Sequence, residues 1–268
     1  MRRALLWLLP GLALGIPALT WLLPLEDNPL IVRLFGPPQV APREAWPSHG
    51  TATFDHRRLD EVLGRIVGAD GWVDYAALAA DPSDLDAYLA ALGDAPFAAL
   101  PRDGKLALLI NAYNGFTLRL ILDHLPLDSI KDIPAADRWR AVHWRLAGHL
   151  TSLDALEHDA IRAHFADPRV HFALNCASRG CPPLRAEAYA PDRLDAQLED
   201  QARRVHADPR FVRVEGSTLH LTRLYLWYRG DFEHAAGSAA EFVARWVALP
   251  PNAKIVWLPY DWALNGVD

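Results

Sequence analysis

The longest helical pattern in the chain is DGKLALLINAYNGFTLRLILDHL, residues 103–125. Apolar residues recur at helical spacing from Leu106 to Ile121 and cover most of the circumference. A helix that is apolar on most sides is buried inside a domain. Its two asparagines, Asn111 and Asn114, lie one turn apart on the same side. We therefore expect a domain built around this helix, with two amides in its interior.

The segments on either side of this helix predict a mixture of helices and strands. Helical spacing comes first in the sequence and strand patterns concentrate later, which favours an α+β fold over a doubly wound parallel sheet. We expect a single domain over residues 51–268, with the buried helix packed on a mainly antiparallel sheet. The predicted helices are 54–67, 76–92, 151–166 and 191–206, with a capping box at Ser238 and Glu241. The predicted strands are 71–75, 170–175 and 253–258, with strand pairs in 139–150 and 211–221.

The amino-terminal segment predicts a membrane anchor. Residues 4–25 carry no charge and follow Arg2 and Arg3, and as a helix they would span about 30 Å. The preceding arginines favour an inside amino terminus, which places the rest of the chain outside the cytoplasm, in the periplasm. A cleaved signal peptide is the alternative. The proline-rich residues 26–50 are expected to be a linker to the domain.

Composition and motifs exclude several functions. The formal net charge of -6 offers no basic field for nucleic acid. The chain contains no glycine-rich nucleotide loop, no HExxH and no Gly-x-Ser-x-Gly, so no cofactor is expected. The histidine-rich stretch 143–171 has no pair at zinc-ligand spacing, so we expect no metal site. His143, His149, Glu157, His158 and His171 are the residues from which one could be built.

Both cysteines lie in VHFALNCASRGCPP, residues 170–183. Cys176 and Cys181 either form a disulfide that closes a tight loop, or Cys176 is a catalytic thiol, or both are inert. On a regular strand His171 and Cys176 face opposite sides, which argues against a simple catalytic pair. The loop after Cys176 supplies backbone amides, and Arg179 could lower the pKa of the thiol.

A catalytic hypothesis assigns roles to a small set of residues. Cys176 would be the nucleophile, His171 or His158 the base, and Asn111 or Asn175 the orienting or oxyanion-binding group. The candidate substrate-binding residues are Tyr113, Asn114, Glu157, Ser178, Arg179 and Cys181. The alternative for the buried asparagines is that they hold a neighbouring loop through its backbone.

Several ordered motifs together resemble the DUF547 family, a domain of unknown function found in bacteria and plants. The resemblance covers about residues 55–265 and leaves the activity open. Two positions depart from the family pattern, Gly180 and Leu109. The motifs are Gly71-x-Val73-Asp74-Tyr75, Asn111-Ala-Tyr-Asn114, Ser152-Leu-Asp154 with Glu157-His158, Asp167 to Cys176, Cys181-Pro182-Pro183, Trp227-Tyr228 with Asp231-Phe232, and Tyr260-Asp261-Trp262-x-Leu264-Asn265.

A weaker analogy links the predicted order of elements to papain-like and transglutaminase-like folds. In those folds the nucleophilic cysteine opens the buried helix, whereas this helix carries Asn111. A site of that kind would be a degenerate one, formed by Asn111, His171 and Asn175.

Two functional hypotheses follow. The one favoured at this level is a membrane-tethered, non-catalytic module that binds a peptide or another envelope component, with Cys176 and Cys181 joined as a staple. The alternative is a thiol-dependent hydrolase or acyl transferase that acts on peptide or amide bonds, with Cys176 as nucleophile.

Overall fold

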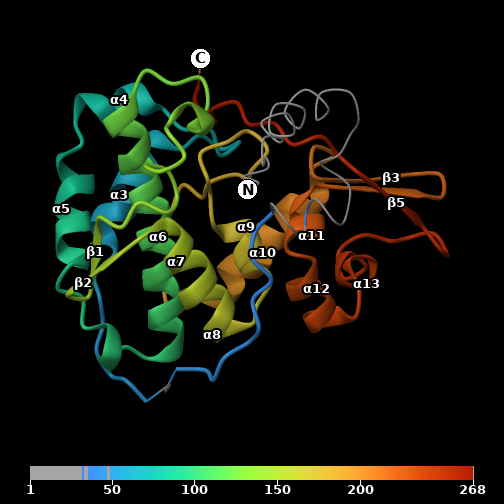
Figure 1. Ribbon diagram of the computed structural model, residues 1–268, viewed down its shortest axis with the longest axis horizontal. Coiled ribbons are helices and arrows are strands. Elements are labelled where there is room, and N and C mark those ends of the chain that lie inside the picture. The colour runs from blue at the N-terminus through green and yellow to red at the C-terminus, as the bar shows by residue number, and fades with distance from the viewer. Residues whose placement is uncertain (1–31, 33–35, 47–48, 268) are drawn as a thin grey trace, which may run out of the picture. The chain divides into compact units, whose positions relative to one another are not determined.

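The computed structural model describes residues 32, 36–46 and 49–267 (Figure 1). The chain divides into two compact units, Met1–Pro38 and Gln39–Asp268, and the helices and strands from α3 onward lie in the second. The predicted membrane span, residues 4–25, and most of the predicted linker before Gln39 lie outside the described residues. Within the described ranges, no helix is both long enough and apolar enough to cross a membrane.

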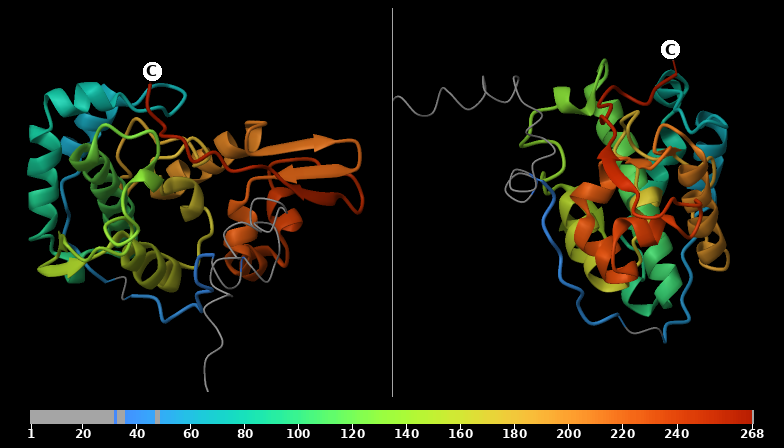
Figure 2. Two further views of the ribbon diagram at one scale, coloured as in Figure 1. Left: turned by 45° about the horizontal axis from the view of Figure 1, so that its top comes forward. Right: turned by 90° about the vertical axis from the view of Figure 1, so that its right-hand side faces the viewer.

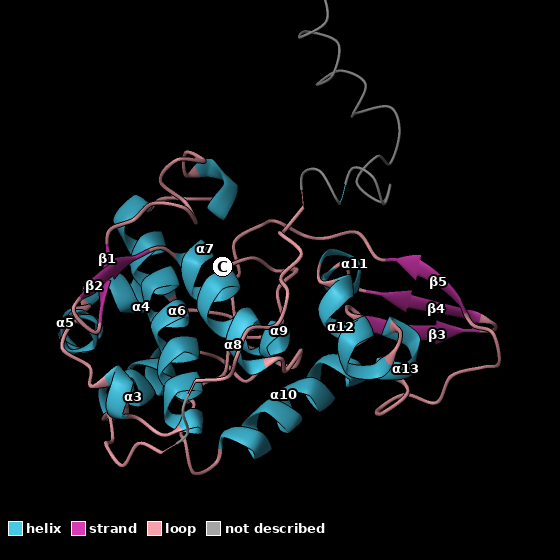
Figure 3. Cartoon of the chain, turned by 60° about the horizontal axis from the view of Figure 1, so that its bottom comes forward, coloured by secondary structure: helices cyan, strands magenta, loops and turns pink. Residues whose placement is uncertain are grey.

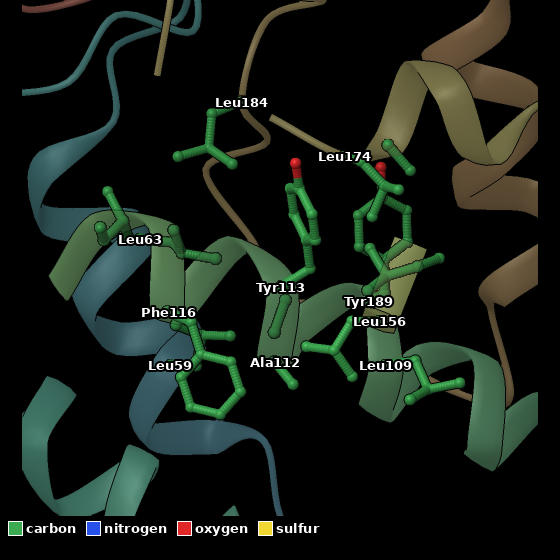
Figure 4. Close-up of a cluster of buried hydrophobic side chains, with 14 of the residues drawn as sticks. Leu59, Leu63, Leu109, Ala112, Tyr113, Phe116, Leu156, Leu174, Leu184 and Tyr189 are labelled. Atoms are coloured by element: carbon green, nitrogen blue, oxygen red, sulfur yellow. The ribbon is translucent and has the colours of Figure 1, made fainter. Parts of the chain in front are cut away.

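Helix α6 (Arg102–His124) is the buried centre of the fold, as predicted. Every residue from Gly104 to Leu118 is buried. Helices α4 (Tyr75–Ala80) and α5 (Ser83–Leu92) pack against it, and α3 (Arg57–Ile66) packs on those two. Figure 4 shows Ala112 and Phe116 of α6 in one apolar cluster with Leu59 and Leu63 of α3.

The expectation that this helix packs on a mainly antiparallel sheet is wrong, because its neighbours are mostly helices. A helix that is apolar on all sides needs apolar partners on all sides, and amphipathic helices supply them. Strand β1 (Trp144–Leu146) contacts α6 through the stacked rings of Trp144 and Phe116, 4.8 Å apart. It forms the predicted hairpin with β2 (His149–Thr151). The 3₁₀ helices η2 (Phe97–Ala99) and η3 (Ile130–Asp132) precede and follow α6 in the sequence.

The predicted helix 151–166 is present but has an unusual middle. Its cap is Ser152, whose hydroxyl accepts a hydrogen bond from the amide of Ala155. The helix consists of α7 (Leu153–Ala155), the π-helical segment η4 (Leu156–Arg162) and α8 (Ala163–Phe165). A π-helical turn holds more residues than an α-helical turn and is frequent at functional sites. Here it turns Glu157, His158 and Arg162 into the interior.

The predicted strand 170–175 is wrong: Val170–Ala173 is a helical turn, α9. The carboxylate of Asp167 accepts a hydrogen bond from the amide of Arg169, and backbone bonds from Val170, His171 and Phe172 complete the turn. This local hydrogen bonding outweighs the strand preference of the apolar residues. Two other predictions also need correction. Of the predicted strand 71–75, only Val73 pairs, in isolated bridges, and Pro82 divides the predicted helix 76–92 into α4 and α5.

The rest of the chain forms a second apolar cluster around a small sheet. Strands β3 (Val212–Glu215) and β4 (Thr218–Leu221) form the predicted hairpin, and β5 (Lys254–Trp257) pairs with β4 in parallel. Figures 2 and 3 show this sheet, with α11–α13, at the opposite end of the unit from α3–α5. The fold is therefore α+β, with two small sheets. The helices of this half are α10 (Leu194–Ala207), α11 (Leu224–Trp227), α12 (Arg229–Ala236) and α13 (Ala239–Val243).

Candidate functional site

Asn175 braces the loop that carries both cysteines. Its side-chain oxygen accepts a hydrogen bond from the amide of Ala177 at 2.8 Å, and its side-chain nitrogen donates to the carbonyl of Pro182 at 2.9 Å. The side chain of Asn265 donates to the same oxygen at 3.2 Å. These bonds hold the two ends of the loop together and support Ala177 in a left-handed conformation, with φ of 61°. Asn175 thus positions the loop, because its side-chain oxygen and nitrogen both form hydrogen bonds with the loop backbone.

Cys176 and Cys181 are free thiols, so the predicted disulfide staple is wrong. The sulfur of Cys176 lies 3.2 Å from the hydroxyl of Ser178 and 3.3 Å from that of Tyr260. The sulfur of Cys181 accepts hydrogen bonds from the amide of Cys176 at 3.1 Å and from Tyr260 at 3.2 Å. Both sulfurs are therefore held by hydrogen bonds in the reduced state. Cys176 is partly exposed and Cys181 is buried.

The two thiols differ in their tendency to ionise. Hydrogen bonds from Cys181, Ser178 and Tyr260 lower the pKa of Cys176, although burial opposes them. Burial raises the pKa of Cys181, and its hydrogen bond to Cys176 adds to the effect. A thiolate is the nucleophilic form of cysteine, so Cys176 is the more reactive of the two.

The phenol of Tyr113 projects from α6, and Figure 4 shows its hydroxyl pointing away from the helix. Only 3% of the residue is exposed. Burial raises the pKa of its hydroxyl, and the charges of Glu157, Cys176 and Tyr228 raise it further. These groups therefore lie within electrostatic range of one another.

A second group of buried polar side chains connects η4 with α9 and α12. The guanidinium of Arg162 donates two hydrogen bonds to the carboxylate of Asp231, at 2.7 and 3.0 Å. The same carboxylate accepts from Nε2 of His171 at 2.7 Å. Arg162 also lies 3.0 Å from Nδ1 of His158. The ring of His171 stacks on Tyr228 at 3.9 Å. Burial raises the pKa of the Tyr228 hydroxyl, and the charge of Glu157 raises it further.

Arg162 and Asp231 form a buried ion pair in this network. Burial raises the pKa of Asp231, but hydrogen bonds from His171 and Arg162 outweigh it and lower the pKa to about 2. Burial lowers the pKa of His171, so its ring is neutral near pH 7. Asp231 and Arg162 also line a cavity of about 370 Å³, together with His234 and residues 39–42.

The two asparagines of α6 form hydrogen bonds with backbone groups and do not line the thiol site. Asn111 forms two hydrogen bonds with the backbone of Tyr189, at 2.8 and 2.9 Å. Asn114 donates to the carbonyl of Ala173 at 3.0 Å and accepts from the amide of Asn175 at 2.9 Å. The interpretation that these asparagines hold a neighbouring loop through its backbone therefore fits the structure. Asn114 links α6 directly to the start of the cysteine loop.

The other predicted site residues fall into two groups. Ser178 and Cys181 contact Cys176, and Tyr113 lies within electrostatic range of it. His158 and His171 belong to the network of Arg162 and Asp231. The guanidinium of Arg179 lies over the ring of Trp72, 4.4 Å away, and donates to the carbonyl of Leu264. Among the described residues, no group of three His, Cys, Asp or Glu side chains is arranged to hold a metal ion.

Tyr260, Asp231, Arg162 and Tyr228 contact the predicted site residues directly but were not among them. A signal was available for three of them. Tyr228 and Asp231 lie in one of the motifs that carry the family resemblance, and Tyr260 opens another. Arg162 carried no such signal.

A family model described as "Protein of unknown function, DUF547" matches residues 97–204. The matched segment contains α6, the π-helical segment, α9 and the cysteine loop. Comparisons with curated proteins and with solved structures find no match to the chain.

Proposed function

We infer that this chain, a member of the DUF547 family, is a thiol-dependent acyl transferase or hydrolase whose nucleophile is Cys176. The substrate bond would be a peptide or amide bond. The observation that carries the proposal is the hydrogen bonding of the Cys176 sulfur by Ser178 and Tyr260, in a free and partly exposed thiol. Groups that stabilise a thiolate in this way activate it as a nucleophile.

The same hydroxyl groups suit the next step of the reaction. The thiolate attacks the substrate carbonyl carbon, and negative charge moves from sulfur to the carbonyl oxygen. Ser178 and Tyr260 each have one hydroxyl proton; with Cys176 ionised these protons point to its sulfur, and after the attack they can turn to that oxygen. The carbon–nitrogen bond breaks, the amine leaves with a proton taken from water, and an acyl group remains on Cys176 as a thioester. Water or a second nucleophile then releases the acyl group and restores the thiol.

A non-catalytic binding module is the competing function, and its support has weakened. It depended on a disulfide between Cys176 and Cys181 and on strand geometry that separates His171 from Cys176. Both thiols are free, and residues 170–173 are helical. The His171 ring is nevertheless hydrogen-bonded to Asp231, so a base for Cys176 is not part of the proposal. A thiol that is already ionised near neutral pH does not need one.

The location of the reaction is proposed from the sequence. Residues 4–25 would anchor the chain in a membrane, with the bulk of the chain on the periplasmic side. The substrate would then be a peptide or protein of the envelope.

The test is acylation of the purified chain with p-nitrophenyl acetate, an activated acyl donor. We expect a burst of nitrophenolate with about one acetyl group per chain on Cys176, followed by steady turnover. The burst should persist in Cys181→Ser and vanish in Cys176→Ser. Absence of an acetyl adduct on Cys176 would exclude the enzyme, and a burst without turnover would indicate a reactive thiol only.

A further inference from the structure

Three aromatic rings form a continuous surface beside the cysteine loop. The ring centroid of Tyr260 lies 4.7 Å from that of Trp227 and 4.6 Å from that of Trp262. The centroids of the two tryptophans are 5.8 Å apart. All three residues are partly exposed. We call these three rings the aromatic surface. It joins the last residue of α11 to the segment that follows β5.

The aromatic surface is connected directly to the proposed nucleophile. The hydroxyl of Tyr260 lies 3.3 Å from the sulfur of Cys176 and 2.9 Å from the hydroxyl of Ser178. The ring that carries this hydroxyl is the one that both tryptophans contact. An acyl group bonded to the Cys176 sulfur therefore begins next to the aromatic surface.

Core packing accounts for only part of these rings. Trp262 packs against the larger apolar cluster, and Nζ of Lys131 lies over its ring at 3.8 Å from the centroid. Trp227 and Tyr260, in contrast, belong to neither of the two apolar clusters of the described residues. Tryptophan and tyrosine outside a core are typical of binding surfaces, because they bring a large apolar area. Apolar area of Trp227 and Tyr260 is therefore available to a substrate.

We propose that the aromatic surface selects the acyl group, and that the substrate is a peptide with an aromatic side chain on the carbonyl side of the scissile bond. Aromatic rings favour contact with other rings, edge to face or offset, at centroid separations of about 4.5–7 Å. Trp227 and Trp262 would then be specificity-determining residues. The positive charge of Lys131 beside Trp262 disfavours a cationic side chain at the same place. The inference rests on the proposed function, because it names the substrate class of that enzyme.

The experiment compares three acyl groups on the wild-type chain, supplied as p-nitrophenyl esters. They are acetyl, 3-phenylpropionyl, which has the carbon skeleton of phenylalanine without its amino group, and 3-cyclohexylpropionyl, its saturated counterpart. With each ester the Cys176 thiolate attacks the carbonyl carbon, a carbon–sulfur bond forms, the carbon–oxygen bond breaks and nitrophenolate leaves. The acylation rate constant is divided by that of N-acetylcysteine, which removes the intrinsic reactivity of the ester.

We expect the aromatic acyl group to react fastest. Burial of a phenyl ring should make the normalised rate for 3-phenylpropionyl at least about tenfold higher than for acetyl. Ring-to-ring contact should make it about two- to tenfold higher than for 3-cyclohexylpropionyl.

One variant and a matched control locate the preference. Trp227→Ala should lower the ratio of 3-phenylpropionyl to acetyl at least about fivefold, because it removes one of the three rings. Any change in the thiol itself cancels in this ratio. Trp46→Ala also removes a partly exposed tryptophan, one that stacks on His164 at 4.0 Å, and should leave the ratio unchanged.

The two proposals fail on different results. If no ester forms an adduct on Cys176, the proposed function fails. If adducts form, but the aromatic group reacts no faster than acetyl or than its saturated counterpart, the aromatic preference is overturned and the enzyme stands. A preference that survives Trp227→Ala would overturn its assignment to the aromatic surface. The comparison of esters uses the wild-type chain and does not depend on the folding of a variant.

Discussion

The hydroxyl of Tyr260 should set the reactivity of Cys176, and removing it tests the electrostatics of the site. The pKa of Cys176 is lowered from 9.0 to about 7. Two pKa units correspond to about 2.7 kcal/mol in favour of the thiolate. The lowering comes from hydrogen bonds, of which the bond from Cys181 contributes most, followed by those from Ser178 and Tyr260.

Tyr260→Phe deletes one of these donors and keeps the ring. A hydrogen bond to a charged group is worth about 1.5 kcal/mol or more, so the pKa of Cys176 should rise by about one unit. The thiolate fraction at pH 7 then falls from about one half to about one tenth. Alkylation by iodoacetamide depends on the thiolate, so its rate at pH 7 should fall about fivefold. At pH 10 the two proteins should react at nearly equal rates.

The assay is the alkylation rate of Cys176 between pH 5 and pH 10, read peptide by peptide so that Cys181 is scored separately. Tyr189→Phe is the matched control, because the buried Tyr189 hydroxyl has no hydrogen-bond partner in the part of the chain that the structure describes. A wild-type midpoint near pH 9, or coincident profiles for wild type and Tyr260→Phe, would refute this account of the thiol.

Three further predictions concern stability, each measured by urea unfolding of the purified chain. Asn114→Ala should lower the free energy of unfolding by about 2–4 kcal/mol, because two buried backbone groups lose their partner; an unchanged midpoint would contradict the bracing role. Gly71→Ala should lower the free energy of unfolding by about 2 kcal/mol or more. Gly71 has a φ of +85°, and an added Cβ would lie 2.3 Å from Pro183. The pKa of Asp231 is lowered from 3.8 to about 2, so its ionised form stabilises the fold fully above pH 4. The free energy of unfolding should fall by about 2 kcal/mol as the pH falls from 4 to 2, and Asp231→Asn, which removes the carboxylate, should not show this loss.

The sequence was sufficient to predict the parts of the fold that depend on local pattern. Residues 103–125 are apolar on nearly every side, so a buried helix followed directly. The hairpin 211–221 was equally clear, because alternation around Gly216 is a short-range signal. The turn at Asp167 was harder to predict. The same Asp-Pro pair that ends one helix also begins α9, and the apolar residues after it have the composition of a strand.

The residues of the site could be predicted from the sequence better than the way they are arranged. The cysteine loop, Glu157 and Tyr113 could be named in advance, but not their partners. Asn114 holds Asn175, 61 positions further on, and Cys176 meets Tyr260, 84 positions further on. No spacing rule connects residues so far apart. Both sulfurs hydrogen-bond the hydroxyl of Tyr260, and only the tertiary structure shows where that hydroxyl lies.

The distance along the chain between Cys176 and Tyr260 makes the reactive thiol a property of the completed fold. In an unfolded or half-assembled chain Cys176 would ionise like any ordinary cysteine and react slowly. Its nucleophilicity appears only when α6, the cysteine loop and the segment around Tyr260 have come together. The thiol of a newly made chain is thereby protected from modification until the chain has folded. Conversely, fast alkylation at neutral pH reports that an individual molecule has reached its native state.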